Sequence, residues 1–561
     1  MTMNGEQIQF HLWPWSAIGR AQETKDVTGR EVVLPYYGSP VLSVPRDFRV
    51  STDARHEDFL PLSVPYDGDR YRLYRVPHAV AASRHAARGD EDMNLVISCD
   101  GRRFRMHVRS EGAVSGSLRD EGELQQAVLE WMSFFDFCVQ RAVSREKGAS
   151  SLPWADLPEC IRAYASDADV QKRSLIVAIA EEMPRHVQSL VNAARRVLIH
   201  ERRLLPAARA AEMDSGCLQW YFRQPGLTPV QKASANRQRL QAMARRETFN
   251  TLENRVLREF LLRCVRECRQ YVRVVCSGNR ETGYAAEVNR FGGMCVELLK
   301  RPVWEDVDEL ESGARPNYVL QSDARYRRIW ELYQKLLRKQ DEEDWMWAWQ
   351  GRTWADICTL LLGASLLDMA ARGEGSVKIS PLARAGCGFL GEQVQGSRVV
   401  SGSEPGPFLL RHGHREAVLE LVHDSQAAQH NVVSELGCTG GTLFFVLRAL
   451  GNRETKARVM VVWPVHTLSS TIRQDFQDVQ QSAEQGLESM SWFVNMRYSR
   501  TRLTGLVLAD AFLRGEPDFE AGKNTHLARL SADPLCWMKN IEVLTMLLDD
   551  LFAELLESDD A

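Results

Sequence analysis

The periodicity of the hydrophobic residues changes twice along this chain, and that pattern restricts the folds open to it. Up to about residue 120, short runs rich in Val, Ile, Tyr and Phe, such as "NLVISCDG" and "RFRMHVRS", are bounded by Gly, Pro and Asp, which is typical of strands. From "GELQQAVLEWMSFFDFCVQRAV" onward, apolar residues recur at helical spacing. Alternation returns in the last third, between helical segments. The sequence therefore predicts an α+β multidomain protein with a β-rich N-terminal domain, a helical middle and a C-terminal α/β domain.

A chain of 561 residues is too long for one hydrophobic core, so we expect several domains. The helical part includes "RHVQSLVNAARRVLIHERRLL", which we expect to be helical throughout. In the last third, "FLLRHGHREAVLELVHD" and residues 440–470 each predict a hairpin, followed by a helix, the strand "TGLVLADAF" and a terminal helix. The boundaries that follow are 1–120 for the β-rich domain, 121–370 for the helical domain, 371–406 for a linker with one short strand, and 407–561 for the α/β domain.

Several features favour a cytoplasmic protein. No window approaches the length of apolar sequence that spans a membrane, and the first residues lack the basic and apolar regions of a signal peptide. The twelve cysteines are scattered without a C-x-x-C pair. Cys264 and Cys268 are one helical turn apart, a spacing compatible with zinc, but they fall on the apolar stripe of their helix, which favours core packing.

The net charge of −4 conceals a basic segment. Residues 185–273 contain 18 Lys and Arg against 7 Asp and Glu. Such a segment on an acidic chain favours a localised anionic partner, nucleic acid first, although solvated Arg-rich helix faces are the alternative. Without a recognition-helix or zinc-finger pattern, we expect contacts to the phosphate backbone. The candidate DNA-binding residues are Arg195, Arg196, Arg202, Arg203, Arg245, Arg246, Arg255, Arg258, Arg263 and Arg266.

A cluster of tryptophans follows the basic segment. These residues, five between positions 330 and 354, lie beside arginines, a combination that can stack on nucleic-acid bases. Tryptophans at helical spacing more often fill a core or a seam between domains, and we favour that interpretation. The chain contains no G-x-x-x-x-G-K-[ST], G-x-G-x-x-G, H-E-x-x-H or G-x-S-x-G, so a nucleotide-driven motor or a serine hydrolase has no support.

The clearest helical segment carries a resemblance to a known family. Residues 249–264, "FNTLENRVLREFLLRC", resemble the T-x-E-N-R helix signature of the domain of unknown function 2357, a family related to McrC. The resemblance implies a protein of a prokaryotic restriction or anti-phage locus. It also implies a β-rich N-terminal part, a helical middle and a C-terminal PD-(D/E)XK nuclease domain, which is the order of elements predicted here.

The positions of the catalytic residues in such a nuclease domain are altered in this sequence. The resemblance places the Pro-Asp that opens the first catalytic strand at Gly440, Gly441 or Thr442, and the acid-x-Lys of the second strand within Trp463–His466. Neither acid is present, nor is the lysine. Carboxylates hold the Mg²⁺ that activates water in such sites, so the resemblance implies a degenerate nuclease-like domain, with no catalytic residue, metal or cofactor.

Three functions remain open. We expect a non-catalytic DNA-binding or scaffold component of an anti-phage or restriction system, working with a separately encoded AAA+ ATPase, helicase or nuclease. The alternative is an active Mg-dependent DNA endonuclease, and the third possibility is an assembly subunit that does not contact DNA. The endonuclease would use a displaced ligand set drawn from Glu420, Asp424, Glu454, Lys456 and His466, with His412, His414 and His423 nearby. However, Glu454 and Lys456 fit a polar turn better than a strand.

Overall fold

The chain forms two compact units in this computed structural model. Unit 1 comprises Met1–Val170 and Asp341–Ala561, and unit 2 comprises Gln171–Gln340. The helical region predicted at 121–370 is therefore divided between the two units. The structure describes residues 2–3, 6–17, 24–26, 31–34, 41–52, 61–66, 71–75, 94–99, 102–110, 117–145, 151–166, 175–228, 230–232, 239–277, 283–311, 313–348, 350–382, 388–394, 397–399, 404–427, 429–436, 439–450, 457–466, 476–497, 501–510 and 516–557.

The first part of unit 1 consists of strands, as predicted. One sheet has the order β4-β3-β6-β9-β8 and a second has the order β5-β11-β10-β7, while β1 pairs with β2. The strands are Thr2–Met3 (β1), Glu6–Gln7 (β2), Gln9–His11 (β3), Thr24–Asp26 (β4), Glu31–Leu34 (β5), Val41–Pro45 (β6), Arg49–Thr52 (β7), Pro61–Tyr66 (β8), Tyr71–Arg75 (β9), Asn94–Cys99 (β10) and Arg102–Ser110 (β11). A 3-10 helix, η1 (Pro14–Ala17), follows β3.

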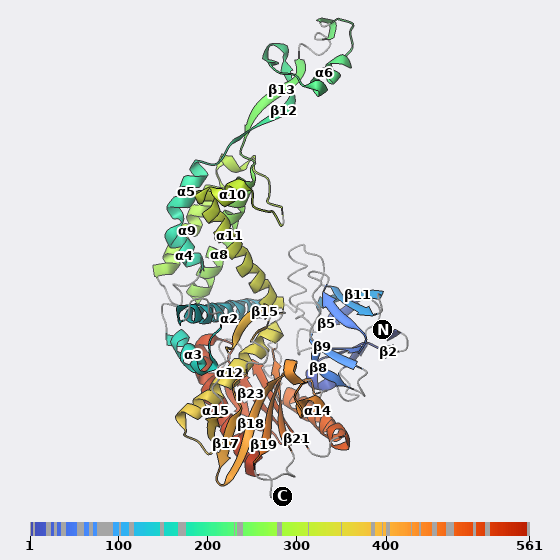
Figure 1. The fold of residues 1–561 in the computed structure, drawn as a ribbon, viewed down its shortest axis with the longest axis vertical. Helices are drawn as coiled ribbons and strands as arrows, with labels where there is room; N and C mark the ends of the chain where they lie inside the picture. The colour runs from blue at the N-terminus through green and yellow to red at the C-terminus, as the bar shows by residue number, and fades with distance from the viewer. Residues whose placement is uncertain are drawn as a thin grey trace. The chain divides into compact units, whose positions relative to one another are not determined.

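A mixed eight-stranded sheet dominates the rest of unit 1, in the order β14-β17-β18-β19-β20-β21-β23-β22 (Figure 1). Neighbours are antiparallel from β14 to β20, whereas β21 runs parallel to β20 and β23 parallel to β21. The central strands β19 and β20 are buried almost throughout, which explains their continuous apolar sequences. The strands are Lys378–Pro381 (β14), Phe408–His412 (β17), Arg415–His423 (β18), Leu443–Ala449 (β19), Ala457–Val465 (β20), Thr501–Asp510 (β21), Asp518–Glu520 (β22) and Thr525–Leu530 (β23).

Two expectations for this region need adjustment. The segment 371–406, expected as a linker with one short strand, contains β14 and a separate pair, β15 (Leu390–Val394) with β16 (Ser397–Val399). After β21, where we predicted only a terminal helix, β22 and β23 extend the sheet. Both are short, and Asp518–Glu520 contains two acids, so neither strand has a strong apolar pattern of its own.

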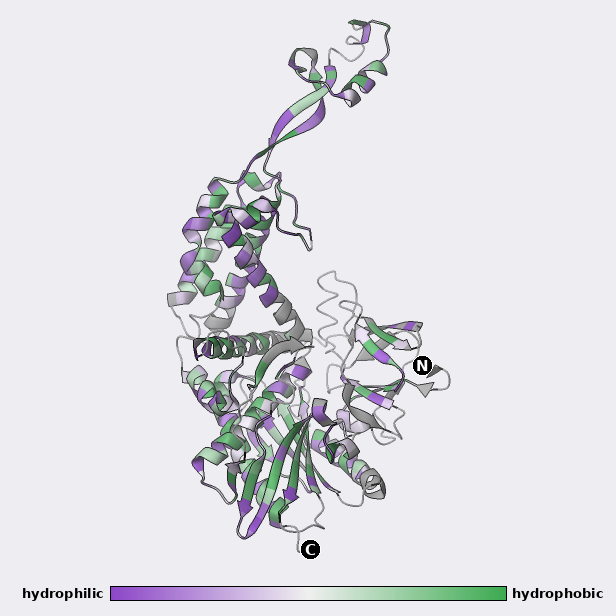
Figure 2. Cartoon of the chain, in the orientation of Figure 1, coloured by the Kyte–Doolittle hydropathy of each residue, from purple (hydrophilic) through white to green (hydrophobic). Residues whose placement is uncertain are grey.

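Helices cover both faces of the eight-stranded sheet. The larger core includes α2 (Ser117–Arg145), α3 (Leu157–Ser166), α12 (Gln350–Arg372) and α15 (Trp537–Glu557). On the opposite face, α14 (Phe476–Arg497) and η1 pack over side chains of β19, β20 and β21. One helix, Gly351–Arg372, is long and apolar enough to span a membrane, but most of it is buried inside unit 1. Figure 2 shows hydrophobic residues concentrated along the strands of this sheet.

Unit 2 is a helical body from which a two-stranded hairpin extends (Figure 1). Its strands β12 (Val197–Pro206) and β13 (Arg239–Thr248) pair over ten residues each, and α6 (Ser215–Phe222) lies in the connection between them. The helical prediction for "VLIHERRLL" is therefore wrong. Its apolar residues suit either period, and the partner strand, about forty residues later, decides the outcome. The helices of the body are Leu175–Glu182 (α4), Pro184–Asn192 (α5), Leu252–Ser277 (α8), Gly283–Leu299 (α9), Tyr318–Ser322 (α10) and, up to Gln340, Ala324–Ala348 (α11).

Candidate functional site

The resemblance located the first catalytic acid just before the N-terminal end of β19, a central strand of the large sheet. Gly440 has a φ of +62°, and a Cβ there would collide with the carbonyl of Pro14 from the N-terminal part of unit 1. A Cβ on Gly441 would lie 2.5 Å from Cγ1 of Val461. Neither position has room for a carboxylate side chain in this structure.

An arginine from the N-terminal strands occupies the space beside the third position, Thr442. Arg75, the last residue of β9, donates from Nη2 to Oγ1 of Thr442 at 2.6 Å and from Nη1 to the carbonyl of Gly351 at 2.7 Å. Arg75 and Thr442 are both buried. Burial and the neighbouring Arg352 lower the pKa of Arg75 to about 10, so it still carries its charge at neutral pH. A fixed cation thus lies where the resemblance implies a metal-binding acid.

A second arginine pairs with one of the candidate ligands of the endonuclease alternative. Nη1 of Arg352 lies 3.1 Å from Oδ2 of Asp424, and Nδ1 of His423 lies 2.8 Å from Oδ1. Burial favours a neutral acid, but the charges and hydrogen bonds of His423 and Arg352 outweigh it and hold the pKa of Asp424 well below its ordinary value. Asp424 is therefore a buried carboxylate whose two oxygens already have partners.

Two further acids lie near this end of the sheet, and each has its own partners. Asp356 on α12 accepts backbone hydrogen bonds from Arg398 and Val399, and burial raises its pKa above the ordinary value. Nδ1 of His466 lies 3.0 Å from Oδ2 of Asp510, and both side chains are buried. Around the His466 ring, Trp131 and Trp354 have centroids 5.7 and 6.1 Å away.

The remaining candidate ligands do not lie together, because each contacts a different partner. Glu420 lies 3.1 Å from Arg448, and Nε2 of His412 lies 3.0 Å from Glu557, while His414 is exposed. Glu454 and Lys456 lie outside the described residues. Within the described parts of the chain, no group of three or more His, Cys, Asp or Glu side chains has an arrangement that could hold a metal ion.

In unit 2, the "TLENR" segment fastens the base of the hairpin to the helical body. Thr251 caps α8 by accepting from the backbone of Asn254 at 3.4 Å. The amide of Asn254 donates to the carbonyls of Arg195 and Phe249, at 2.8 and 2.7 Å. These two residues flank the hairpin, one before β12 and one after β13. The hydroxyl of Tyr326 on α11 donates to Oδ1 of Asn254 at 3.2 Å.

The neighbouring acid of the same segment completes this hub. Oε1 of Glu253 accepts from Nη1 of Arg195 at 2.5 Å and from the amide of Asn317 at 2.8 Å. Burial acts in the opposite direction, but these hydrogen bonds and the charge of Arg195 lower the pKa of Glu253. The sequence signature therefore has a structural role that its spacing did not reveal, because the partners come from residues about 60 positions away.

The ten candidate DNA-binding arginines fall into two groups. On or beside the hairpin, the side chains of Arg195, Arg196, Arg202, Arg203, Arg245 and Arg246 are between 41% and 69% exposed. On α8, Arg255 and Arg263 are only 26% and 17% exposed. Eight of the ten pair with an acid of unit 2: Arg195 with Glu253, Arg196 with Glu247, Arg202 with Asp214, Arg203 with Glu201, Arg245 with Glu212, Arg246 with Asp306, Arg255 with Asp308 and Arg263 with Glu259.

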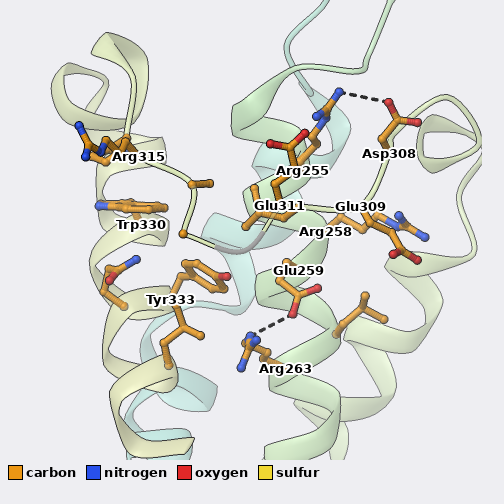
Figure 3. Close-up of a pocket in the computed structure, with 17 residues that line it drawn as sticks. Arg255, Arg258, Glu259, Arg263, Asp308, Glu309, Glu311, Arg315, Trp330 and Tyr333 are labelled. Atoms are coloured by element: carbon orange, nitrogen blue, oxygen red, sulfur yellow. Dashed lines mark hydrogen bonds and ion pairs between the residues drawn. The ribbon is translucent and has the colours of Figure 1, made fainter. Parts of the chain in front are cut away.

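Three arginines of α8 line a pocket of about 740 Å³ (Figure 3). Arg255, Arg258 and Arg263 form one side, and residues 308–311 and 313–316 together with Trp330 and Tyr333 of α11 form the others. Nη1 of Arg258 donates to the carbonyl of Val307 at 3.1 Å. Arg266, the remaining candidate on α8, is exposed and lies outside this pocket.

The cysteines and tryptophans that raised alternatives in the sequence now have defined places. Cys264 and Cys268 are buried in the core of unit 2, and burial raises the pKa of Cys268 to about 12, which disfavours a thiolate ligand. Trp354 is buried in unit 1 and donates to the carbonyl of Leu508. Trp330, by contrast, is partly exposed at the pocket.

The protein thus has a mixed α/β unit with buried ion pairs near the start of the central strand β19. Its second unit is helical and carries a hairpin rich in arginine. Residues 165–333 match the family model described as "Domain of unknown function (DUF2357)". The matched region contains the "TLENR" hub, the hairpin and most of the pocket. No curated protein matches this chain.

Proposed function

We propose that this protein is a non-catalytic DNA-binding component of a prokaryotic anti-phage or restriction system that acts in the cytoplasm. The observation that carries this proposal is the division of charge between the two units. Unit 2 contains 31 Lys and Arg against 19 Asp and Glu, whereas the rest of the chain contains 39 against 55. Arginines on an exposed hairpin can neutralise phosphates and release counterions without reading base sequence.

The weakness of the existing ion pairs supports the hairpin as the DNA-contacting element. Its arginines pair with acids at the surface, and such exposed pairs contribute only about 0–1 kcal/mol each. A phosphate can therefore replace the acid at little cost. The α8 arginines are less accessible, so we assign them a smaller share of the phosphate contacts.

We further propose that the eight-stranded sheet is a degenerate PD-(D/E)XK-like domain. Three antiparallel strands, β18 to β20, are followed by α14 and by β21 parallel to β20, in agreement with the closing helix and strand that the resemblance implies. In this interpretation, Arg75 and the close approach of Pro14 replace the acids and the metal. The protein then serves as a DNA-bound platform for a separately encoded AAA+ ATPase, helicase or nuclease.

Salt-dependent binding of fluorescent duplex DNA tests the leading proposal. For the double variant Arg203→Glu and Arg245→Glu on the hairpin, we expect weaker binding and a plot of log affinity against log salt that is shallower by about two. A matched control, Arg290→Glu with Arg327→Glu, makes the same change in net charge on exposed positions of the helical body. Equal losses in both variants, or no DNA binding at all, would contradict a hairpin-centred site and favour the assembly subunit.

The endonuclease alternative has its own test. We expect no cleavage of plasmid DNA in Mg²⁺ or Mn²⁺, because Asp424 and His466 belong to separate buried pairs. Metal-dependent cleavage that disappears in Glu454→Ala or Asp424→Asn would overturn the non-catalytic proposal. Asp424→Asn keeps the size of the side chain, so a loss of activity would not simply report a packing defect.

A further inference from the structure

The pocket lined by α8 and α11 in unit 2 is larger than a simple ion needs, and its lining contains charges of both signs. Its volume of about 740 Å³ lies in the range of small-molecule sites, about 300–1,000 Å³. It is lined by four arginines and four acids, so it carries no net charge when all of them are ionised. The eight are Arg255, Arg258, Arg263, Arg315, Glu259, Asp308, Glu309 and Glu311. A bare anion would meet repulsion from the acids, which favours a ligand with both acceptor and donor groups.

One side of the pocket suits a phosphate group. Arg255 and Arg258 lie on this side, three positions apart on α8, whereas Arg315 lies across the opening beside Trp330 (Figure 3). The pair of Arg255 with Asp308, whose carboxylate is 68% exposed, is a surface pair and therefore costs little to exchange.

The opposite side suits a flat heteroaromatic ring. The Trp330 ring is partly exposed, and its centroid lies 5.8 Å from that of Tyr333, which is itself held under the guanidinium of Arg263 at 5.6 Å. Leu262, Leu310 and Leu337 supply apolar surface beside these rings. Stacking of a base on an aromatic side chain contributes to binding irrespective of which base it is.

The acids of the loop supply hydrogen-bond acceptors. The side chains of Glu309 and Glu311 have no partner among the described residues, and both line the pocket. Such carboxylates accept hydrogen bonds from the N–H groups of a base or from sugar hydroxyls. We propose that this pocket binds a nucleotide unit, with the base on Trp330, the phosphate at Arg255 and Arg258, and base or sugar donors at Glu309 and Glu311.

A nucleotide unit has two sources, a free mononucleotide or one residue of a single strand, and titration of the full-length protein with each separates them. For Trp330→Ala, we expect the affinity for the true source to fall about 5- to 150-fold, the range for the loss of one stacked base. Trp330→Phe, which keeps a ring, should restore most of the affinity and also show that the fold persists. Tyr318→Ala, an 81% exposed aromatic outside the pocket, is the matched control and should have no effect.

Two results support the proposal: Trp330-dependent binding of mononucleotides, or Trp330-dependent binding of a short single-stranded oligonucleotide alone. Two results overturn it: inorganic phosphate binding as tightly as the nucleotide, or Trp330→Ala leaving every affinity unchanged. Only the single-strand source rests on the proposed DNA binding. Failure of the pocket can be distinguished from failure of the proposed DNA binding. Loss of stacking at Trp330 changes the affinity without changing the salt slope, whereas reversal of charge on the hairpin changes the slope.

Discussion

The arginines near the start of β19 in the large sheet and the arginines on the hairpin have different surroundings. That difference gives the two groups opposite roles. Arg75 and Arg352 are enclosed in unit 1, where they contact Thr442, Asp424 and a backbone carbonyl. The side chains of Arg245 and Arg246 are 69% and 41% exposed and pair with surface acids. A buried charge that loses its partner is costly, whereas an exposed pair exchanges freely with solvent or phosphate. One residue type is therefore structural in one unit and available for binding in the other.

The largest expected effect tests the buried side of this comparison. Arg352→Met removes the cation next to the buried Asp424, and we expect unit 1 to lose about 3–5 kcal/mol of unfolding free energy in urea. Arg411→Met is the control, because Arg411 pairs with Glu416 on the surface and should cost less than about 1 kcal/mol. Similar losses in the two variants would show that the buried pair of Arg352 and Asp424 does not stabilise unit 1.

The next effect depends on pH. His11 is buried, neither ring nitrogen has a hydrogen-bond partner among the described residues, and burial lowers its pKa to about 4. Between pH 6.5 and about 4, the unfolded chain takes up a proton that the folded chain does not. Stability should therefore fall as the pH drops through that window, by about 3 kcal/mol in total. Urea unfolding of His11→Phe should lack this part of the pH dependence, whereas His414→Phe, in an exposed turn, should retain it.

The third prediction concerns the attachment of the hairpin. Asn254→Ala removes hydrogen bonds to the carbonyls of Arg195 and Phe249 and to the hydroxyl of Tyr326, so we expect a loss of about 2 kcal/mol in unit 2. Hydrogen exchange should accelerate at both ends of the hairpin base. Tyr326→Phe removes fewer of these bonds and should have a smaller effect. Unchanged exchange in Asn254→Ala would show that the "TLENR" segment does not hold the hairpin.

The smallest expected change in stability sharpens the exposed side of the comparison. Arg246→Met breaks a surface pair with Asp306 and should change the unfolding free energy by less than about 1 kcal/mol. The same variant should make the salt dependence of DNA binding shallower by about one phosphate contact. A large loss of stability without a change in DNA binding would move Arg246 into the structural group.

The sequence predicted some parts of the fold better than others. The β18–β20 strands and the terminal helix were recognisable because their apolar patterns are long and regular. The hairpin of unit 2 was missed because "VLIHERRLL" fits a helix equally well until "RLQAMARRET" pairs with it. The short strands β22 and β23 were missed because they have weak patterns of their own and are defined by addition to an existing sheet.

The candidate sites show the same division. The sequence singled out the arginines of α8 and the altered positions near Gly440 and Pro464, since these follow from residue identity and spacing. It could not show that Arg75 lies at Thr442, because the two residues are 367 positions apart. The pocket was equally invisible, since it is formed by α8, by residues 308–311 and 313–316 and by α11, and only side chains that meet in space enclose a cavity.

Sequence alone determined which charges and apolar stripes the chain carries: a basic middle, an acidic remainder, and apolar strands without the expected acids. Tertiary structure decided which of those charges are buried, which pair with each other and which face solvent. The physical reason is that the free energy of a charge depends on its burial and on its neighbours, and most of these neighbours come from distant parts of the chain. The arginines of unit 1 and unit 2 thus look alike in the sequence and differ only in the fold.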